Sequence, residues 1–153
     1  MSAARAAGAD LWGDLRQTDT YFIVARGRLK LRETAGFQAQ LVYYERDEED
    51  SDRPSEYLVT AVQDGAALKS ALSRALGVLV EVRKRRTLLL LDTTRIHLDN
   101  VEYLGSFLEI EVPVSEDDAT ARRRLDFLIE KLGYTWDDCI RKSYSDILIE
   151  HEA

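Results

Sequence analysis

The sequence predicts an α+β protein with a largely antiparallel sheet, for three reasons. Short segments of strand-forming residues follow one another with turn residues between them, so neighbouring strands should run in opposite directions. Two longer stretches, 64–77 and 115–133, have the apolar spacing of amphipathic helices. Several strand segments carry basic residues at every second position, and closure into a barrel of seven or eight strands would remove exposed edges.

Composition supports a single soluble domain that spans residues 1–153. Of the 153 residues, 45% are hydrophobic and 32% are charged, so the chain is long and apolar enough to bury its own core. The formal charge of −7 argues against a general binder of nucleic acids or anionic membranes, because such proteins depend on an excess of cations.

The single cysteine, Cys139, excludes an internal disulfide and fits a reducing compartment. No apolar run approaches the ~18 residues of a membrane span. The alanine-rich residues 1–10 lack the apolar core of a secretion signal. We therefore expect a cytoplasmic protein.

The first part of the chain predicts one helix and four strands. Residues 3–15 are rich in alanine, the best helix former, and predict a short helix. Gly27 allows a tight turn between the first two strands, and the acidic, turn-rich residues 47–54 predict a loop between the last two. The four strands are expected over 17–25, 27–35, 37–46 and 56–61.

The second part predicts two helices separated by strands. One helix should begin after a capping Asp64 and stop at Gly77, and the other should begin after a capping Ser115 and stop at Gly133. Short helical turns are expected over 135–150. The strands are expected over 78–83 and 87–92, as one continuous strand or with a bend, and over 95–101 and 106–112.

Charge alternation in the strands suggests a cationic surface. Arg28, Lys30 and Arg32 would share one side of a strand, with Leu29 and Leu31 on the other. Such a row of one sign needs either open water or an anion. Further basic residues stand at Arg46, Lys84, Arg86, Arg95 and His97, and one strand instead carries the acids Glu109 and Glu111. If the charged faces point into a barrel, the lumen would suit a phosphate chain and a divalent metal.

Seven short motifs follow one another along the chain. They are Asp19-Thr-Tyr-Phe22, Gly27-Arg-Leu-Lys-Leu-Arg-Glu33, Leu41-Val-Tyr-Tyr-Glu-Arg46 with Ser55-Glu-Tyr57, Val82-Arg-Lys-Arg-Arg86, Arg95-Ile-His-Leu-Asp99, Leu104-Gly-Ser-Phe-Leu-Glu-Ile-Glu111 and Ser143-Tyr-Ser-Asp-Ile-Leu148. In order and spacing they resemble the CYTH family, which groups class IV adenylyl cyclases with thiamine triphosphatases and inorganic triphosphatases. The resemblance covers about residues 10–148 and is closest to the adenylyl-cyclase-like branch.

The resemblance implies a triphosphate tunnel: an antiparallel barrel with flanking helices whose lumen holds a triphosphate and one or two Mg²⁺ or Mn²⁺ ions. Glu109 and Glu111 would bind the metal, and Asp99 is a weaker third candidate. The residues that would contact phosphate oxygens are Lys30, Arg32, Arg46, Lys84, Arg86 and Arg95.

One departure from the family concerns its first strand, which carries Glu-x-Glu-x-Lys and completes the metal site. Nothing before Ala3 supplies this motif, and Glu150-His-Glu152 lacks the lysine. The first family strand is therefore expected to be missing. A sheet with that gap could be covered by a partner chain, so a homodimer is possible.

Several residues have a second interpretation. Glu109 and Glu111 could form internal ion pairs with lumen cations, and Arg46 or Arg95 could pair with a carboxylate such as Asp99. His97 is expected to be a hydrogen-bonded histidine more readily than a catalytic base. Arg26 and Arg28 lie near a turn and are interpreted as surface charges.

The sequence leaves three functions open. A cyclase-like protein and a triphosphatase would use the same cationic lumen, because phosphoryl chemistry depends on positioning and charge stabilisation. A module that binds triphosphate, polyphosphate or a nucleotide without turning it over is favoured by the missing strand. An interaction domain that only keeps the barrel is disfavoured by the lumen cations.

Overall fold

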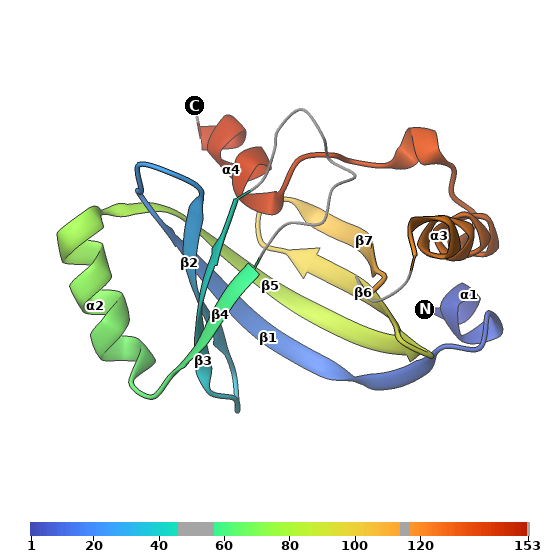
Figure 1. Ribbon diagram of the computed structural model, residues 1–153, viewed down its shortest axis with the longest axis horizontal. Helices are drawn as coiled ribbons and strands as arrows, with labels where there is room; N and C mark the ends of the chain where they lie inside the picture. The colour runs from blue at the N-terminus through green and yellow to red at the C-terminus, as the bar shows by residue number, and fades with distance from the viewer. Residues whose placement is uncertain (46–56, 114–116, 153) are drawn as a thin grey trace. The chain divides into compact units, whose positions relative to one another are not determined.

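The computed structural model describes residues 1–45, 57–113 and 117–152 (Figure 1). Seven strands and five helical segments occur within these ranges. In chain order the elements are α1 (Ser2–Ala6), β1 (Asp10–Phe22), β2 (Arg28–Thr34), β3 (Ala39–Tyr44), β4 (Tyr57–Val62), α2 (Gly65–Leu76), β5 (Val78–Leu91), β6 (Thr94–Val101), β7 (Gly105–Glu111), α3 (Asp118–Leu132), the 3₁₀ helix η1 (Trp136–Asp138) and α4 (Tyr144–Glu152).

The strands form one seven-stranded sheet in the order β4-β3-β2-β1-β5-β6-β7. The pairs β1/β2, β2/β3 and β3/β4 are antiparallel, and each joins neighbours in the sequence. The predicted α+β class with a largely antiparallel sheet is confirmed. The continuous alternative for the valine- and leucine-rich stretch is the correct one, since β5 runs through the basic residues without a break.

The chain groups into two compact units. The α3 unit comprises residues 1–15, 85–100 and 105–141, and the β2 unit comprises residues 16–84, 101–104 and 142–153.

The α3 unit is built around a small apolar core. Its buried members come from α1, β5, β6 and α3 and from the residue before β1. Leu89, Ile96 and Leu128 are completely buried, and Leu98 and Leu132 pack against them. Because burying a leucine or isoleucine side chain contributes about 1.5–3 kcal/mol, these residues fix α3 on β5 and β6.

The β2 unit buries apolar and charged residues on adjacent positions of one strand. Leu31 is completely buried, yet its neighbour Lys30 on the opposite face of β2 is buried as well. The second predicted helix has the predicted ends: the Asp64 carboxylate accepts a hydrogen bond from the Ala67 N–H, and Gly77 caps the helix at φ 82°.

Two predictions about helices are wrong. The helix expected over 3–15 ends at Ala6, because Gly8 takes a positive φ of 95° that reverses the chain into β1. The alanine-rich first residues therefore do not predict the conformation of residues 10–15, which belong to β1. The N-cap of α3 is Asp117, whose carboxylate accepts from the Thr120 N–H, and the expected cap Ser115 lies outside the described residues.

No helix in the described ranges has both the length and the apolar character needed to cross a bilayer.

Candidate functional site

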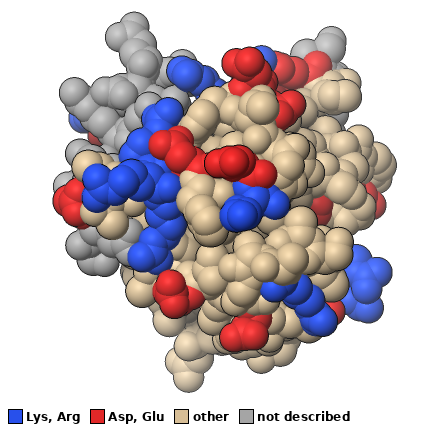
Figure 2. All heavy atoms as spheres, turned by 90° about the vertical axis from the view of Figure 1, so that its right-hand side faces the viewer, with Lys and Arg blue, Asp and Glu red and all other residues tan. Residues whose placement is uncertain are grey.

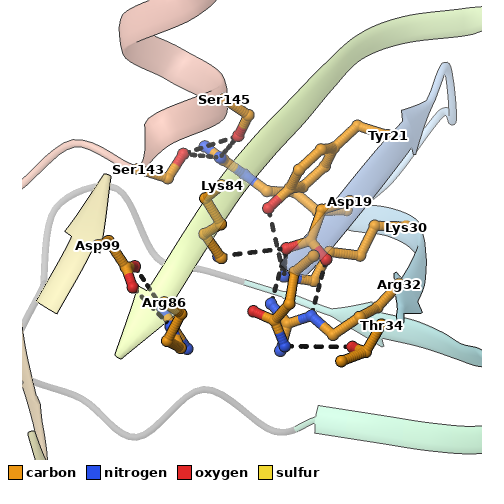
Figure 3. A network of polar contacts seen from close by, with 12 residues as sticks. Asp19, Tyr21, Lys30, Arg32, Thr34, Lys84, Arg86, Asp99, Ser143 and Ser145 are labelled. Carbon is orange, nitrogen blue, oxygen red and sulfur yellow. Dashed lines mark hydrogen bonds and ion pairs between the residues drawn. The ribbon is translucent and has the colours of Figure 1, made fainter. Parts of the chain in front are cut away.

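A buried carboxylate gathers three basic side chains in the β2 unit. Asp19 Oδ2 lies 3.1 Å from Lys30 Nζ, 2.7 Å from Arg32 Nη2 and 3.7 Å from Lys84 Nζ. Arg32 also donates from Nε to Asp19 Oδ1 at 2.7 Å, so its guanidinium binds the carboxylate with two parallel hydrogen bonds. Figure 3 shows all three side chains directed at Asp19. We call these four residues the Asp19 cluster.

Strand register explains how the cluster forms. In the β1/β2 pair, Asp19 is opposite Arg32 and Tyr21 is opposite Lys30. Side chains two apart on a strand share a face, so Lys30 and Arg32 both reach the acid on the neighbouring strand. Lys84 arrives from β5, which follows β1 in the sheet.

Burial and charge oppose each other at the Asp19 carboxyl. Burial alone would raise its pKa, but the hydrogen bond from Arg32 and the positive charges of Lys30, Arg32 and Lys84 hold the pKa well below its usual range. The carboxylate is therefore ionised at neutral pH. The four side chains together contain three cations and one anion, a balance that attracts a further anion.

Two tyrosines surround the lysine of this cluster. Lys30 Nζ lies 5.3 Å from the centre of the Tyr21 ring and 5.8 Å from that of Tyr44, within the range of cation–π attraction. It also donates to the Tyr21 hydroxyl at 3.4 Å. Burial is the main cause that raises the pKa of each tyrosine to about 12, so both phenols stay neutral.

Gln17 adds a buried amide to the same face of β1. Its Nε2 donates to Thr34 Oγ1 at 3.3 Å, whereas its buried Oε1 has no hydrogen-bond partner within residues 1–45, 57–113 and 117–152. Leaving a buried polar atom unsatisfied costs about 1–3 kcal/mol. A ligand or a water next to Gln17 would remove that cost.

The start of α4 is tied to β2 by an arginine. Arg28 donates to Ser143 Oγ at 2.8 Å and to Ser145 Oγ at 3.3 Å, and it forms an ion pair with Asp146 at 2.9 Å. Its interpretation as a surface charge is wrong, because the side chain is mostly buried in these contacts. Tyr144 in turn lies with its ring 5.3 Å from Lys84 Nζ. The motif at 143–148 thus contacts the Asp19 cluster.

The α3 unit holds a second group of charged side chains, centred on Arg86. Arg86 binds both carboxylate oxygens of Asp99, at 2.8 and 2.6 Å, and also contacts Glu109. His97 Nδ1 lies 3.2 Å from Glu109. Glu111 makes two longer contacts. It lies 3.8 Å from His97 Nε2 and 3.5 Å from Arg95 Nη1. We call Arg86, Arg95, His97, Asp99, Glu109 and Glu111 the Arg86 cluster.

The acids of the Arg86 cluster are arranged as ion pairs. No group of three or more His, Cys, Asp or Glu side chains in the described ranges is placed to hold a metal ion. Yet Glu109 and Glu111 are each about half exposed, at 50% and 53%, and carboxylate oxygens are the donors that Mg²⁺ and Mn²⁺ prefer. Each of these two carboxylates also contacts a guanidinium, Glu109 that of Arg86 and Glu111 that of Arg95.

The sequence-predicted residues fall into both clusters. Lys30, Arg32 and Lys84 come together around one acid, and Arg46 lies outside the described residues. The other predicted residues, Arg86, Arg95, Asp99, Glu109 and Glu111, belong to the Arg86 cluster.

Sequence reasoning missed the buried acid and its neighbours. Asp19 lies inside the motif at 19–22, but the sequence alone predicts no role for it, nor for Gln17, Tyr21 and Tyr44. The signal was present in the alternation: Gln17, Asp19 and Tyr21 occupy every second position of a strand and so share a face. Which face they share with the cations depends on strand register, which the sequence did not reveal.

Comparison with known families now identifies the fold. The model of the CYTH domain matches residues 2–144, almost the whole chain. The chain belongs to the CYTH family. This match confirms, at the level of the family, the resemblance inferred from the motifs. CYTH proteins bind triphosphate substrates and generally use divalent metal cations.

Solved structures share the fold of this CYTH chain. The PH1012 protein of Pyrococcus horikoshii OT3 is 26% identical with a TM-score of 0.84, and the match covers 95% of this chain and 89% of that one. A conserved hypothetical protein of Pyrococcus furiosus is 20% identical with a TM-score of 0.83, over 95% and 90% of the two chains. A proposed adenylate cyclase of Vibrio parahaemolyticus is 18% identical with a TM-score of 0.79, over 96% and 88%. No curated protein matches the chain.

Proposed function

We propose that this CYTH chain binds a small triphosphate, ATP or another organic or inorganic triphosphate, and acts on it as a class IV adenylyl cyclase-like protein. The observation that supports this most is the Asp19 cluster, in which three cations converge on one buried carboxylate. Ammonium and guanidinium groups form strong charge-assisted hydrogen bonds with phosphate oxygens. Lys30, Arg32 and Lys84 are the proposed phosphate contacts in this cluster.

The Arg86 cluster has a different proposed role. Glu109 and Glu111 would hold Mg²⁺ or Mn²⁺, with Asp99 as a weaker candidate, and Arg86 and Arg95 would contact phosphate. A bound divalent cation would supply charge neutralisation for the phosphate oxygens. The chain's own contribution is to orient the two glutamates, which Arg86, Arg95 and His97 contact. Arg46 remains a proposed phosphate contact from the sequence.

Clusters of charged side chains can support two reactions of a bound triphosphate, cyclisation and hydrolysis. In a cyclase the ribose 3′-hydroxyl gives up its proton and its oxygen attacks the α-phosphorus, so that pyrophosphate leaves. In a triphosphatase water attacks the terminal phosphorus, the diphosphate leaves, and inorganic phosphate is formed. Neither reaction needs a nucleophilic side chain, because positioning and charge stabilisation lower the barrier. The adenylyl-cyclase-like branch is proposed because the seven sequence motifs together resemble it most. The Vibrio parahaemolyticus likeness, at 18% identity, supports the fold alone.

A second candidate is a module that binds triphosphate without turning it over. The ion pairs of Glu109 with Arg86 and of Glu111 with Arg95 favour it, because each metal-ligand candidate already contacts a cation. A metal would then have to compete with these guanidinium groups. Binding would survive in such a protein while metal-dependent turnover would be weak.

The proposed partner is a small ligand in the cytoplasm, and not a nucleic acid. Figure 2 shows acidic side chains adjoining the basic ones on the face it presents, consistent with a formal charge of −7 for the chain. Nucleic-acid binding depends on an extended excess of cations. A homodimer is also part of the proposal, since β4 ends the sheet and its residues Tyr57, Leu58 and Val59 are exposed.

Calorimetry with tripolyphosphate and with ATP tests the binding proposal. Both ligands should bind at low salt, and affinity should fall steeply as salt is added, because several cations are neutralised together. A parallel turnover measurement with Mg²⁺ or Mn²⁺ should follow phosphate, pyrophosphate and cyclic AMP. The absence of heat with either ligand on folded protein would refute the function. Binding without any product would favour the non-catalytic module.

A further inference from the structure

We propose that Asp19 is a positioning residue that fixes Lys30, Arg32 and Lys84 for phosphate before any ligand arrives. This inference rests on the proposed function, since it explains how the same site would recognise a triphosphate. Asp19 itself would repel phosphate, so its role has to be exerted through the three cations around it.

Exposure places the acid behind Arg32, whereas Lys84 is nearly as buried as Asp19, with 4% of its side chain exposed. The Asp19 side chain is 2% exposed, whereas that of Arg32 is 23% exposed. A ligand can therefore reach the guanidinium while the carboxylate stays covered. The side chain of Lys30 is 11% exposed and lies between these extremes.

The contact geometry fixes direction as well as position. A guanidinium bound through both Nε and Nη2 to one carboxylate cannot rotate without losing both hydrogen bonds, and here both distances are 2.7 Å. Asp19 Oδ2 is also the atom that the ammonium groups of Lys30 and Lys84 approach. One oxygen thus ties β2 and β5 side chains to β1.

The carboxylate also makes the arrangement possible in the absence of ligand. Three like charges brought this close would repel one another, and flexible lysine and arginine side chains would move apart to reduce the repulsion. With Asp19 at their centre the cations stay together. A binding site whose groups are held in advance spends less of its interaction energy on ordering them, and this raises affinity.

Two effects of removing the Asp19 charge have opposite signs. If the acid only cancels positive charge, its removal should tighten phosphate binding. If it positions the cations, its removal should weaken binding even though the site becomes more positive. The direction of the change therefore decides the inference.

The first experiment compares Asp19→Asn with Glu102→Gln in the whole chain. Both variants remove one negative charge, but Glu102 is exposed and pairs only loosely with Arg83, at 3.7 Å. Tripolyphosphate affinity is measured by calorimetry without metal. Asp19→Asn should weaken binding about tenfold or more, the usual scale for losing a partner that orients a binding side chain, and Glu102→Gln should change it less than about twofold. Unchanged or tighter binding by Asp19→Asn would overturn the inference.

A second variant keeps the test decisive if Asp19→Asn does not fold. Arg32→Lys preserves every charge of the cluster but removes the two parallel hydrogen bonds to Asp19. It should also weaken binding about tenfold. Wild-type affinity in a folded Arg32→Lys variant would show that orientation is unimportant.

A readout without ligand separates the inference from the proposed function. In the free protein, the Arg32 Nε–H should give a slowly exchanging NMR signal. Arg32→Lys, which lacks this N–H, identifies the signal, and Asp19→Asn should abolish its protection. Wild-type protein that binds no tripolyphosphate would refute the function, and the inference with it. Wild-type protein that binds tripolyphosphate but shows no protected Arg32 Nε–H would refute the positioning role alone.

Discussion

The two charged clusters differ in the balance of their acids and bases. The Asp19 cluster has three cations around one carboxylate, and that carboxylate is almost completely buried. The Arg86 cluster has two guanidinium groups and an imidazole among three carboxylates, two of them half exposed. Both arise from alternating charges on strands. Alternation along a strand therefore predicts where charges gather, whereas the partners on neighbouring strands decide which ligand the charges suit.

Because the two clusters have different proposed roles, we expect their variants to change different measured properties. Changes in the Asp19 cluster should alter binding of metal-free triphosphate. Changes at the glutamates of the Arg86 cluster should alter the response to metal.

Glu111→Gln should give the largest effect if the chain turns over a triphosphate. A divalent cation held by one carboxylate fewer would be placed less accurately, and a misplacement of ~1 Å can cost about a hundredfold in rate. Metal-dependent turnover is measured against Glu102→Gln, which removes the same charge from the surface. Binding of tripolyphosphate without metal should change little. A fall in metal-free binding as large as the fall in turnover would contradict the division of tasks.

Lys30→Ala should have the next largest effect, on binding. Loss of one charge-assisted contact in a buried site weakens binding by about 1–3 kcal/mol. Calorimetry at low salt compares the affinity of Lys30→Ala for tripolyphosphate with that of Arg26→Ala. Arg26 is exposed, and its substitution removes an equal charge. Equal losses from both variants would indicate diffuse surface attraction instead of a site.

The helices and strands show which parts of this fold were predictable from the sequence. Strand β2 was predicted because its residues alternate strictly, and α2 because Asp64 and Gly77 mark its ends. The sequence predicts a helix over the first residues of β1, because alanine propensity does not show that α1 ends at Ala6 and that β1 begins at Asp10. Local propensity is a weak guide where tertiary pairing decides the outcome.

The candidate site shows a similar limit. Alternation predicts that Lys30 and Arg32 share one face of a strand, and the structure brings them together with Lys84. Their shared partner Asp19 is not predicted, because its position opposite Arg32 depends on the register between β1 and β2. A shift of one residue would have turned Asp19 to the other face.

Acid should destabilise the folded protein through the Asp19 cluster. The pKa of Asp19 is depressed in the folded protein, so its ion pairs contribute stability above the ordinary aspartate pKa of 3.8, and this contribution is lost as pH falls below that value. Wild-type protein should therefore lose more unfolding free energy than Asp19→Asn between about pH 6 and about pH 2. Chemical denaturation at a series of pH values measures the difference. Parallel stability curves for the two proteins would show that Asp19 is not held as a buried ion.

Alkaline pH should have the smallest effect on stability, through Tyr21, whose ring lies beside Lys30 of the Asp19 cluster. Burial and the nearby Asp19 charge raise the pKa of Tyr21 from 10.0 to about 12. A raised phenol pKa means that the folded state holds the proton more tightly, so stability is present below about pH 10 and is lost as pH rises towards 12. Tyr21→Phe should remove that part of the alkaline loss and leave one fewer late-titrating phenol in the absorbance of the phenolate. Tyr103→Phe is the matched control, because Tyr103 is 83% exposed. If Tyr21 titrated together with the exposed tyrosines, the buried aromatic wall around Lys30 would not exist in solution, and the contrast between the two clusters would narrow to their charges alone.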